Sequence, residues 1–431
     1  TGLRRADIEQ AARLVLASKR IVVCWAMGLT QHRNSVATIK EVVNFCLLRG
    51  NVGRHGSGLC PVRGHSNVQG DRTMGINERP SAEFLAALGR EFGFDAPSDP
   101  GLDVVDAIRA MRDGRVAVFM AMGGNFLSAT PDTAVTAGAL RRCRLTVQVS
   151  TKLNRSHLVH GHEALILPCL GRTERDEHAG RAQVVSVEDS MGVVHLSRGT
   201  LAPASPQLRS EVAIVCGLAR RTLRRYEAMV WEDFERDHDT IRDRIARVVP
   251  GFDRFNERVR RPGGFVLPHG PRDTRTFPTP SGRAQFSVNR LEVLRPPTGR
   301  LVLQTIRSHD QYNTTIYGLD DRYRGISHGR RVVLVHPDDL ASAGLADGDI
   351  VDIVGEHGGV ERRAERFRAV AYPTARGCAA AYFPEANVLV PLDSTAETSN
   401  TPTSKSVIVR LEAPARGAVG TAVDGSLAAT D

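Results

Sequence analysis

Residues suited to binding a large anionic ligand concentrate between Asn51 and Gly75. Arg63, Arg72, Asn67 and Gln69 supply hydrogen-bond donors there, and recurrent glycines would let the backbone approach a ligand closely. No period of 2 or 3.6 runs through the stretch, so we expect neither strand nor helix. Irregular loops of this length are uncommon unless functional or disordered, and the Ser/Glu/Lys bias of disorder is missing. The residues favour a ligand site, with an irregular surface loop as the alternative.

Three uncommon strings occur in one order at this end of the chain. They are W-A-M-G-L-T-Q-H (Trp25 to His32), G-N-V-G-R-H-G-S-G (Gly50 to Gly58) and P-V-R-G-H-S-N-V-Q-G (Pro61 to Gly70). Together they resemble the catalytic subunits of the molybdopterin oxidoreductases, in the formate dehydrogenase-like branch. The resemblance implies a bis(molybdopterin guanine dinucleotide) cofactor carrying molybdenum or tungsten.

Strings near the other end match the cofactor-facing loops of the same family: Arg307 to Gly318, Phe383 to Pro391 and Ser399 to Lys405. Two strand ends, at Gly124 and Thr151, resemble positions that hold the nucleotide ends of the cofactor. Plain strand-to-helix turns, and turn capping by Asn313, are the alternatives. The cofactor-binding residues implied by the resemblance are Met27, Gly28, Thr30, Gln31, His32, Asn51, Gly53, Gly64, Asn67, Gln69, Gly70, Gly124, Asn125, Thr151, Lys152, Asn154, Arg307, Gln311, Tyr312, Asn313, Asn387, Ser399 and Lys405.

Arg63 resembles the arginine that sits beside the metal in formate dehydrogenases and orients the carboxylate substrate. A fixed guanidinium binds a carboxylate bidentately and offsets its charge. His65 departs from the pattern, because those enzymes usually carry Gln there, so the substrate stays open. The alternative is that Arg63 binds only cofactor phosphate. No residue of this chain is expected to ligate the metal.

Strands alternate with helices over the first half of the sequence, which predicts parallel sheets of the doubly wound, Rossmann-like type. The expected strands are Arg20 to Trp25, Val116 to Met120 (buried), Leu145 to Val149, Ala164 to Pro168, Gln183 to Val187 and Val193 to Leu196. The expected helices are 6–18, 36–48, 80–94, 103–113 and 131–142, and a charge-rich helical region follows at 207–248.

From Leu301 onward, short strands separated by turns predict a small β-barrel, which resembles the double-psi barrel that ends the family's catalytic subunit. Its expected strands are Leu301 to Ile306, Arg331 to Val335, Ile350 to Val354, Phe367 to Ala371, Ala379 to Phe383 and Ser406 to Leu411. The predicted domains are the end of an α/β domain (1–65), a second α/β domain (66–215), a helical and irregular crossover (216–297), the cofactor-binding barrel (298–412) and a disordered tail (413–431).

Composition limits the partners. The net charge is +9, but the arginine clusters lie among acidic residues with few aromatics, so we expect solvated helix faces and no nucleic acid. No apolar run approaches the ~18 residues of a membrane span. A polar loop, Gly171 to Gly180, holds carboxylates that we expect to be solvated and to bind no metal.

The seven cysteines are scattered and show no C-x-x-C spacing, so they predict reduced core thiols of a cytoplasmic protein. No iron–sulfur cluster can be built from local spacing. Because the chain opens on an amphipathic helix without an initiating Met, we expect a C-terminal part of a longer subunit. The resemblance implies a 4Fe-4S cluster upstream of this part.

The resemblance favours a two-electron oxidoreductase that acts on formate or another small anion and exchanges electrons with a redox partner protein. A non-catalytic chain that keeps the fold and binds cofactor or a partner is the alternative. A nucleotide-dependent α/β enzyme is a third class, but a P-loop and a GxGxxG after a strand are both missing from the sequence. On its own, the chain is expected to be inactive and poorly stable.

Overall fold

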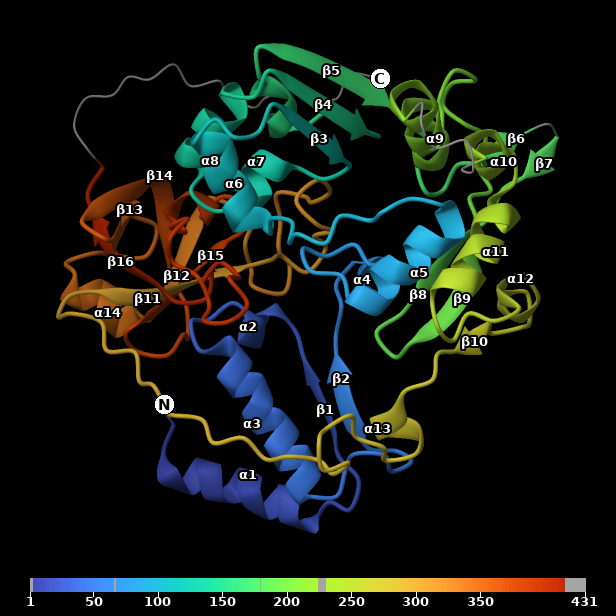
Figure 1. Cartoon of the computed structure of the whole chain (residues 1–431). Coiled ribbons are helices and arrows are strands. Elements are labelled where there is room, and N and C mark those ends of the chain that lie inside the picture. Colours follow the sequence, from blue (N-terminus) through green and yellow to red (C-terminus); the bar gives the residue numbers. More distant parts are fainter. Residues whose placement is uncertain (1–2, 66, 179, 224–229, 415–431) are drawn as a thin grey trace.

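The computed structural model of this chain describes residues 3–65, 67–178, 180–223 and 230–414 (Figure 1). The helices are α1 (Arg5–Ala17), α2 (Met27–Thr30), α3 (Ser35–Leu48), α4 (Val68–Thr73), α5 (Ala82–Phe92), α6 (Val104–Arg112), α7 (Phe126–Ala129), α8 (Thr133–Arg141), α9 (Glu211–Thr222), α10 (Trp231–Arg236), α11 (His238–Val248), α12 (Phe255–Val259), α13 (Gly270–Asp273) and α14 (Pro337–Ser342). Two 3-10 turns are η1 (Arg155–Leu158) and η2 (Asn387–Leu389).

The strands form small sheets and one closed barrel. They are β1 (Val22–Trp25), β2 (Gly58–Pro61), β3 (Val118–Met122), β4 (Leu145–Ser150), β5 (Glu163–Pro168), β6 (Glu177–His178), β7 (Arg181–Ala182), β8 (Val185–Glu188), β9 (Val193–Ser197), β10 (Phe265–Val266), β11 (Leu301–Ile306), β12 (Val332–Val335), β13 (Ile350–His357), β14 (Val360–Ala371), β15 (Cys378–Tyr382) and β16 (Val407–Glu412).

The first unit is a β1–α3–β2 crossover in which β1 and β2 pair in parallel, with Val22 opposite Gly58 and Trp25 opposite Pro61. The expectation that the stretch from Asn51 to Gly75 holds neither strand nor helix is therefore wrong, since it contains β2 and α4. The expectation failed because β2 is defined by its hydrogen-bonded ladder with β1, which lies more than thirty residues earlier in the sequence. Local periodicity carries no trace of that pairing.

A second parallel sheet has the order β3-β4-β5. Helices α6 and α8 cover one face and pack Ile108, Met111 and Leu140 into a buried apolar cluster. Asp103 caps α6 by accepting from two backbone N–H groups of its first turn, as an N-cap aspartate does. The expectation of a buried strand at Val116 to Met120 needs correction. β3 is an edge strand, and alternate side chains, among them Val118 at 56% exposure, face outward.

An antiparallel sheet β8-β9-β10 packs with α11 and α12 around Phe252 and Phe255. Its strand β10, with α12 and α13, lies in the segment 250–297 that was expected to be irregular. The polar loop Gly171 to Gly180 likewise contains β6, which pairs with β7. These elements are only two to five residues long, so periodicity within them is too short to detect.

The last part is a closed six-stranded barrel in the order β11-β15-β12-β14-β13-β16 (Figure 1). The barrel mixes two parallel pairs, β11 with β15 and β12 with β14, with four antiparallel pairs. Leu303, Val333 and Phe367 lie in its interior. The predicted fold class, Rossmann-like parallel sheets followed by a C-terminal barrel, is confirmed. The strand expected at Phe367 to Ala371 is the second half of the longer β14.

Buried polar contacts join the barrel to the β3-β4-β5 unit. Arg362 of β14 donates to Asp132 over 2.6 Å, and their side chains are 14% and 7% exposed. Asp132 precedes α8 with φ at 51°, and its backbone N–H donates to Val390 O at 2.8 Å. Asn387, one of the predicted cofactor-binding residues, donates its amide to the backbone oxygens of Ser128 and Thr130 at 3.0 and 2.6 Å.

Among the described helices, none is both long and apolar enough to cross a membrane. Of the predicted tail 413–431, residues 415–431 lie outside the described part. The expectation of core cysteines is only partly right. Cys46, Cys143, Cys169 and Cys216 are buried, but Cys24 is exposed and two others are intermediate.

We predict that Asp132→Asn destabilises the chain by about 3 kcal/mol. Asparagine keeps the shape and tolerates a positive φ, but it leaves the buried Arg362 without its counter-charge. Urea unfolding followed by circular dichroism measures the change. Asp113→Asn is the matched control, because Asp113 pairs with Arg112 at the exposed surface. An equal loss of unfolding free energy in both variants would contradict the stabilising role of the buried Arg362–Asp132 pair.

Candidate functional site

The loops that follow β1 and β2 leave the same edge of their sheet, because the two strands are parallel. After β1 the chain enters α2 (Met27–Thr30), and after β2 it passes through Arg63 and Gly64, both exposed. The N–H of Val62 donates to Trp25 O at 2.7 Å, so the ladder continues up to Arg63. Ligands of open α/β sheets bind beyond this carboxyl edge.

Arg63 is held in place by two neutral partners. Its guanidinium donates to Gln69 Oε1 at 3.1 Å, and its backbone N–H donates to Ser190 Oγ at 3.1 Å. The ring of His65 lies 6.4 Å from that of Tyr312 in the barrel. The loop after β2 therefore faces the barrel, and the positive charge of Arg63 is not taken up by either partner.

The loop continues into α4 through a constrained corner. Asn67 has φ at 65° and its Oδ1 accepts the N–H of Glu188 at 3.0 Å. A Cβ on Gly70 would lie 2.1 Å from that same oxygen, so a larger residue would displace the Asn67 side chain from its contact with Glu188. The side-chain oxygen of Asn67 thus holds the loop against β8.

Lys405 connects the barrel to the loop after β1. Its backbone N–H donates to Gln31 O at 3.1 Å, and its Nζ donates to the backbone oxygen and, at 3.1 Å, to the hydroxyl of Thr305. Burial, and secondarily the charge of Arg307, lower the pKa of Lys405 to about 8. Burial also lowers the pKa of Arg307. Two cations thus lie close together in a partly dehydrated place.

Two further contacts, made by the residues that follow Gln31, hold this corner. His32 Nε2 lies 2.9 Å from Gly28 O, and burial lowers the pKa of His32, with a further contribution from Lys405. Arg33 forms an ion pair with Glu397 at 3.1 Å. Ser399 follows in this barrel loop, at its exposed outer side.

The barrel loop that begins at Arg307 is shaped by internal hydrogen bonds. Gln311 Nε2 donates to Asn313 O and to Phe383 O, each at 2.8 Å. Asn313 has φ at 59°, and its Oδ1 accepts the N–H of Thr314 at 2.9 Å. The guanidinium of Arg307 lies 5.3 Å from the ring of Phe383. Gln311 and Asn313 therefore hold the loop in shape.

Arg330 is a positioning residue that the sequence did not single out. It is 4% exposed, and its guanidinium lies between the rings of Tyr317 and Tyr382, at 4.4 and 4.7 Å from their centroids. It ties together two of the three predicted barrel loops, Arg307 to Gly318 and Phe383 to Pro391. Its acceptors are Ser308 Oγ at 2.5 Å, Gln311 Oε1 at 2.9 Å, Phe383 O at 2.9 Å and Glu385 Oε1 at 2.8 Å.

A second group of predicted residues meets at the carboxyl edge of the β3-β4-β5 sheet. Asn154 donates to Gly124 O at 2.8 Å, and Ser156 donates to Asn125 Oδ1 at 2.8 Å. Asn125 in turn donates to Thr314 O of the barrel at 3.4 Å. Glycine and amide positions from two strand ends are thus joined to the barrel loop.

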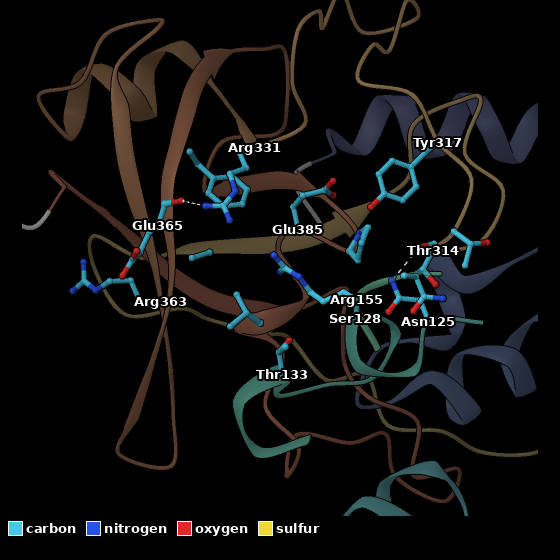
Figure 2. Close-up of a pocket in the computed structure, with 16 residues that line it drawn as sticks. Asn125, Ser128, Thr133, Arg155, Thr314, Tyr317, Arg331, Arg363, Glu365 and Glu385 are labelled. Atoms are coloured by element: carbon cyan, nitrogen blue, oxygen red, sulfur yellow. Dashed lines mark hydrogen bonds between the residues drawn. The ribbon is translucent and has the colours of Figure 1, made fainter. Parts of the chain in front are cut away.

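A cavity of about 600 Å³ opens at this junction, as Figure 2 shows. Asn125 and Asn154 line it together with Arg155, Arg331 and Arg363. The sequence did not mark these three arginines as site residues. Arg155 could have been found, since it directly follows Asn154. The other two lie at the barrel and meet the cavity only through tertiary folding.

Several predicted residues lie elsewhere. Asn51 is fully buried, and its Oδ1 accepts the N–H of Ile21, just before β1, at 3.2 Å. The backbone oxygen of Gly53 accepts from Arg275 at 3.1 Å. Both lie at the amino edge of the β1–β2 sheet, opposite Arg63. Thr151 and Lys152 are exposed after β4.

In the described ranges, no group of His, Cys, Asp and Glu side chains is arranged to hold a metal ion. The carboxylates of Gly171 to Gly180 are not all solvated as expected. Asp176 lies 3.2 Å from His178 Nε2, with exposed fractions of 18% and 16%. The short β6–β7 hairpin accounts for this, because it folds the loop back onto α11.

The corner around Lys405 fits a group that carries phosphates. Among the described residues, neither Lys405 nor Arg307 has a carboxylate within salt-bridge distance. Two like charges buried together are unfavourable unless an anion compensates them. An anionic pyrophosphate placed there would satisfy both, and this donor set therefore suits the cofactor that the sequence suggested.

Residues 301–408 match the family described as "Molydopterin dinucleotide binding domain". The chain is 64% identical over 417 residues to "Uncharacterized oxidoreductase Rv2900c" of Mycobacterium tuberculosis, covering 96% of this chain and 54% of the relative. It is 42% identical over 419 residues to "Protein YdeP" of Escherichia coli K12, covering 96% and 55%. The chain thus spans about half the length of these relatives.

The fold is similar to that of acetylene hydratase from Pelobacter acetylenicus, with a TM-score of 0.66 at 14% identity, over 96% of this chain and 63% of the other. At that identity the likeness concerns the fold alone. Of these comparisons, the matched binding domain concerns residues 301–408, and the relative from Mycobacterium tuberculosis is named an oxidoreductase.

We predict that Lys405→Met stabilises the unliganded chain below pH 8 by about 1–3 kcal/mol. The pKa of Lys405 is lowered from 10.5 to about 8, so the protonated side chain opposes folding at pH 7. Between about 8 and 10.5 only the unfolded state keeps the proton, so wild-type stability rises with pH there and the difference shrinks.

Urea unfolding at pH values on both sides of 8 measures this difference. Lys40→Met is the control, because Lys40 is exposed on α3 and should show no such pH dependence. A Lys405→Met chain that is less stable than wild type at pH 7 would mean that the ammonium has a stabilising partner.

Proposed function

We propose that this chain forms the cofactor- and substrate-binding part of a molybdopterin-dependent oxidoreductase that transfers two electrons to or from formate or another small anion. The observation that carries the proposal is that loops from separate parts of the chain meet at one edge of the β1–β2 sheet. The loops after β1 and β2 meet two barrel loops through Lys405–Gln31 and His65–Tyr312 contacts. These segments are distant in sequence, and three cations among them, Arg63, Arg307 and Lys405, have no carboxylate within salt-bridge distance in the described part of the chain.

The proposed cofactor is bis(molybdopterin guanine dinucleotide) with molybdenum or tungsten, whose metal supplies the two-electron chemistry when bound. Lys405 and Arg307 would hold one pyrophosphate, because both are cations without a carboxylate partner in the described part of the chain. Asn125, Asn154, Arg155 and Arg331 of the 600 Å³ cavity would hold a nucleotide end, whereas Arg363 is already paired with Asp352 and Glu412. Hydrogen bonds of Arg330 keep the barrel loops in position for this binding.

Arg63 is the proposed substrate-binding residue. Its guanidinium is exposed at the carboxyl edge of β2 and is held only by the neutral Gln69 and, through its backbone, by Ser190. It can therefore donate two parallel hydrogen bonds to a carboxylate and offset its charge. His65 stands in the place of a glutamine, two residues after Arg63, and would modify which small anion is accepted.

The relatives support this assignment at the level of their names, since one is called an oxidoreductase. Because the chain covers 54% of that relative, the activity of the natural full-length protein remains part of the proposal. So do a 4Fe-4S cluster held outside this chain, and a redox partner protein that receives the electrons. The isolated chain, with incomplete sheets, is proposed to be inactive.

The natural full-length protein, expressed with molybdate and tungstate, tests the cofactor directly. We expect molybdenum or tungsten by elemental analysis and guanine nucleotide after acid release. Absence of both would refute the proposal. Presence of the nucleotide without electron transfer from any small anion to a dye would instead favour a non-catalytic, cofactor-binding chain.

We predict that Arg63→Ala in the full-length protein leaves metal and guanine content nearly intact and lowers kcat by ~100-fold or more, because a charge contact in the transition state is lost. The rate of dye reduction with formate and with other small anions measures kcat, and elemental and guanine analysis measure the cofactor content. Arg54→Ala is the control, because Arg54 is exposed before β2, at the opposite edge of the sheet. An empty cofactor site in Arg63→Ala, or unchanged turnover, would exclude the substrate role.

A further inference from the structure

Cys24 and Cys60 are neighbours across the β1–β2 ladder. They are register partners in parallel strands, so both side chains project from the same face of the sheet. Burial, and after it contact with Cys24, raise the pKa of Cys60. Cys24 is exposed and Cys60 is partly buried. One thiol is therefore open to reagents, and the second lies directly beside it.

The spacing of the pair permits a disulfide under strain. Adjacent strands lie about 4.8 Å apart, which falls within the Cα separation of roughly 4.4–6.8 Å that disulfides require. Side chains that project in parallel keep about the same separation at Cβ, whereas disulfides prefer roughly 3.5–4.5 Å. The strands must therefore draw together, and strained or exposed disulfides are the readily reduced ones.

We propose that Cys24 and Cys60 form a redox-responsive thiol pair that closes to a labile disulfide by exchange with a low-molecular-weight disulfide such as oxidised glutathione. The Cys24 thiolate attacks the reagent and releases one glutathione. The Cys60 thiolate then attacks the sulfur of Cys24 and releases the second glutathione. The protein pair loses two protons and two electrons, and the reagent disulfide takes them up as two thiols.

The environments of the two thiols fit this order of events. Burial, contact with Cys24 and the charge of Asp189 raise the pKa of Cys60, which disfavours its thiolate as the first nucleophile. Cys24 is the more accessible of the two. Buried cysteines are poor competitors, since burial raises the pKa of Cys169 and of Cys216 to about 11.

The pair lies next to the loops of the candidate site, so a disulfide there would affect their position. Trp25 and Pro61, the next residues of each strand, are register partners, and the loops carrying Met27 and Arg63 follow at once. Drawing the strands together would shift these loops against the barrel. The thiol chemistry itself needs neither the cofactor nor the substrate named above, so it can fail or succeed independently of them.

The experiment is peptide mapping of the natural full-length protein after exposure to oxidised glutathione, with free thiols alkylated before digestion. Trypsin separates the two cysteines, because Cys24 falls in residues 21–33 and Cys60 in residues 55–63. We expect these peptides to be joined, with loss of two alkylatable thiols, and to separate again after mild treatment with reduced glutathione.

Variants test the order of attack. In Cys60→Ser, glutathione should accumulate on peptide 21–33, and in Cys24→Ser, Cys60 should stay free. Cys378→Ser is the control and should leave the joined peptides unchanged. The proposal is overturned if native wild-type protein yields no joined peptide, if Cys24 pairs with another cysteine, or if urea-unfolded protein yields the same pairing.

Discussion

The parallel pairing of β1 with β2 is the constraint from which the candidate site follows. It makes residues 27–32 and the loop at Arg63 neighbours at one edge, although more than thirty residues separate them in the sequence. An antiparallel pairing would have sent the two loops to opposite edges. The barrel then closes this edge from the other side, through Lys405, which donates to Gln31 O. Each of these contacts is a backbone hydrogen bond or a ring contact, so the geometry does not depend on a particular substrate.

Electrostatics gives that edge its chemical character. Lys405 and Arg307 are held where burial disfavours their charges, and the charge of Arg307 lowers the pKa of Lys405 further. Folding alone gains nothing from such an arrangement, whereas a bound anion would turn it into a favourable one. Arg330, in contrast, donates hydrogen bonds to Glu385 and to three neutral acceptors. Its function is therefore to fix the barrel loops. Arg330 thus belongs to the scaffold, whereas Lys405 and Arg307 are left without a carboxylate partner among the described residues.

Much of the fold could be predicted from the sequence, because α3, β4 and the barrel strands carry their own periodicity. The loop at Asn51 to Gly75 shows the limit. Its glycines and arginines suggested one continuous site, but β2 carries the chain from the amino edge to the carboxyl edge, which leaves Asn51 and Gly53 remote from Arg63. Arg330 and Arg363 were not found for a related reason. Their partners lie in other segments, and neither a loop residue before β12 nor one of several arginines in the charge-rich β14 stands out by local pattern.

The central claim is that the edge around Lys405 binds the phosphates of a nucleotide-containing cofactor. Only four lysines occur in the chain, so the side-chain ammonium of Lys405 can be followed individually by nuclear magnetic resonance during a pH titration. The direct measurement is its pKa with and without guanosine diphosphate. The account predicts a value near 8 in the free chain that rises when the nucleotide binds. A pKa that stays the same at saturating nucleotide, or an ordinary lysine value in the free chain, would contradict it.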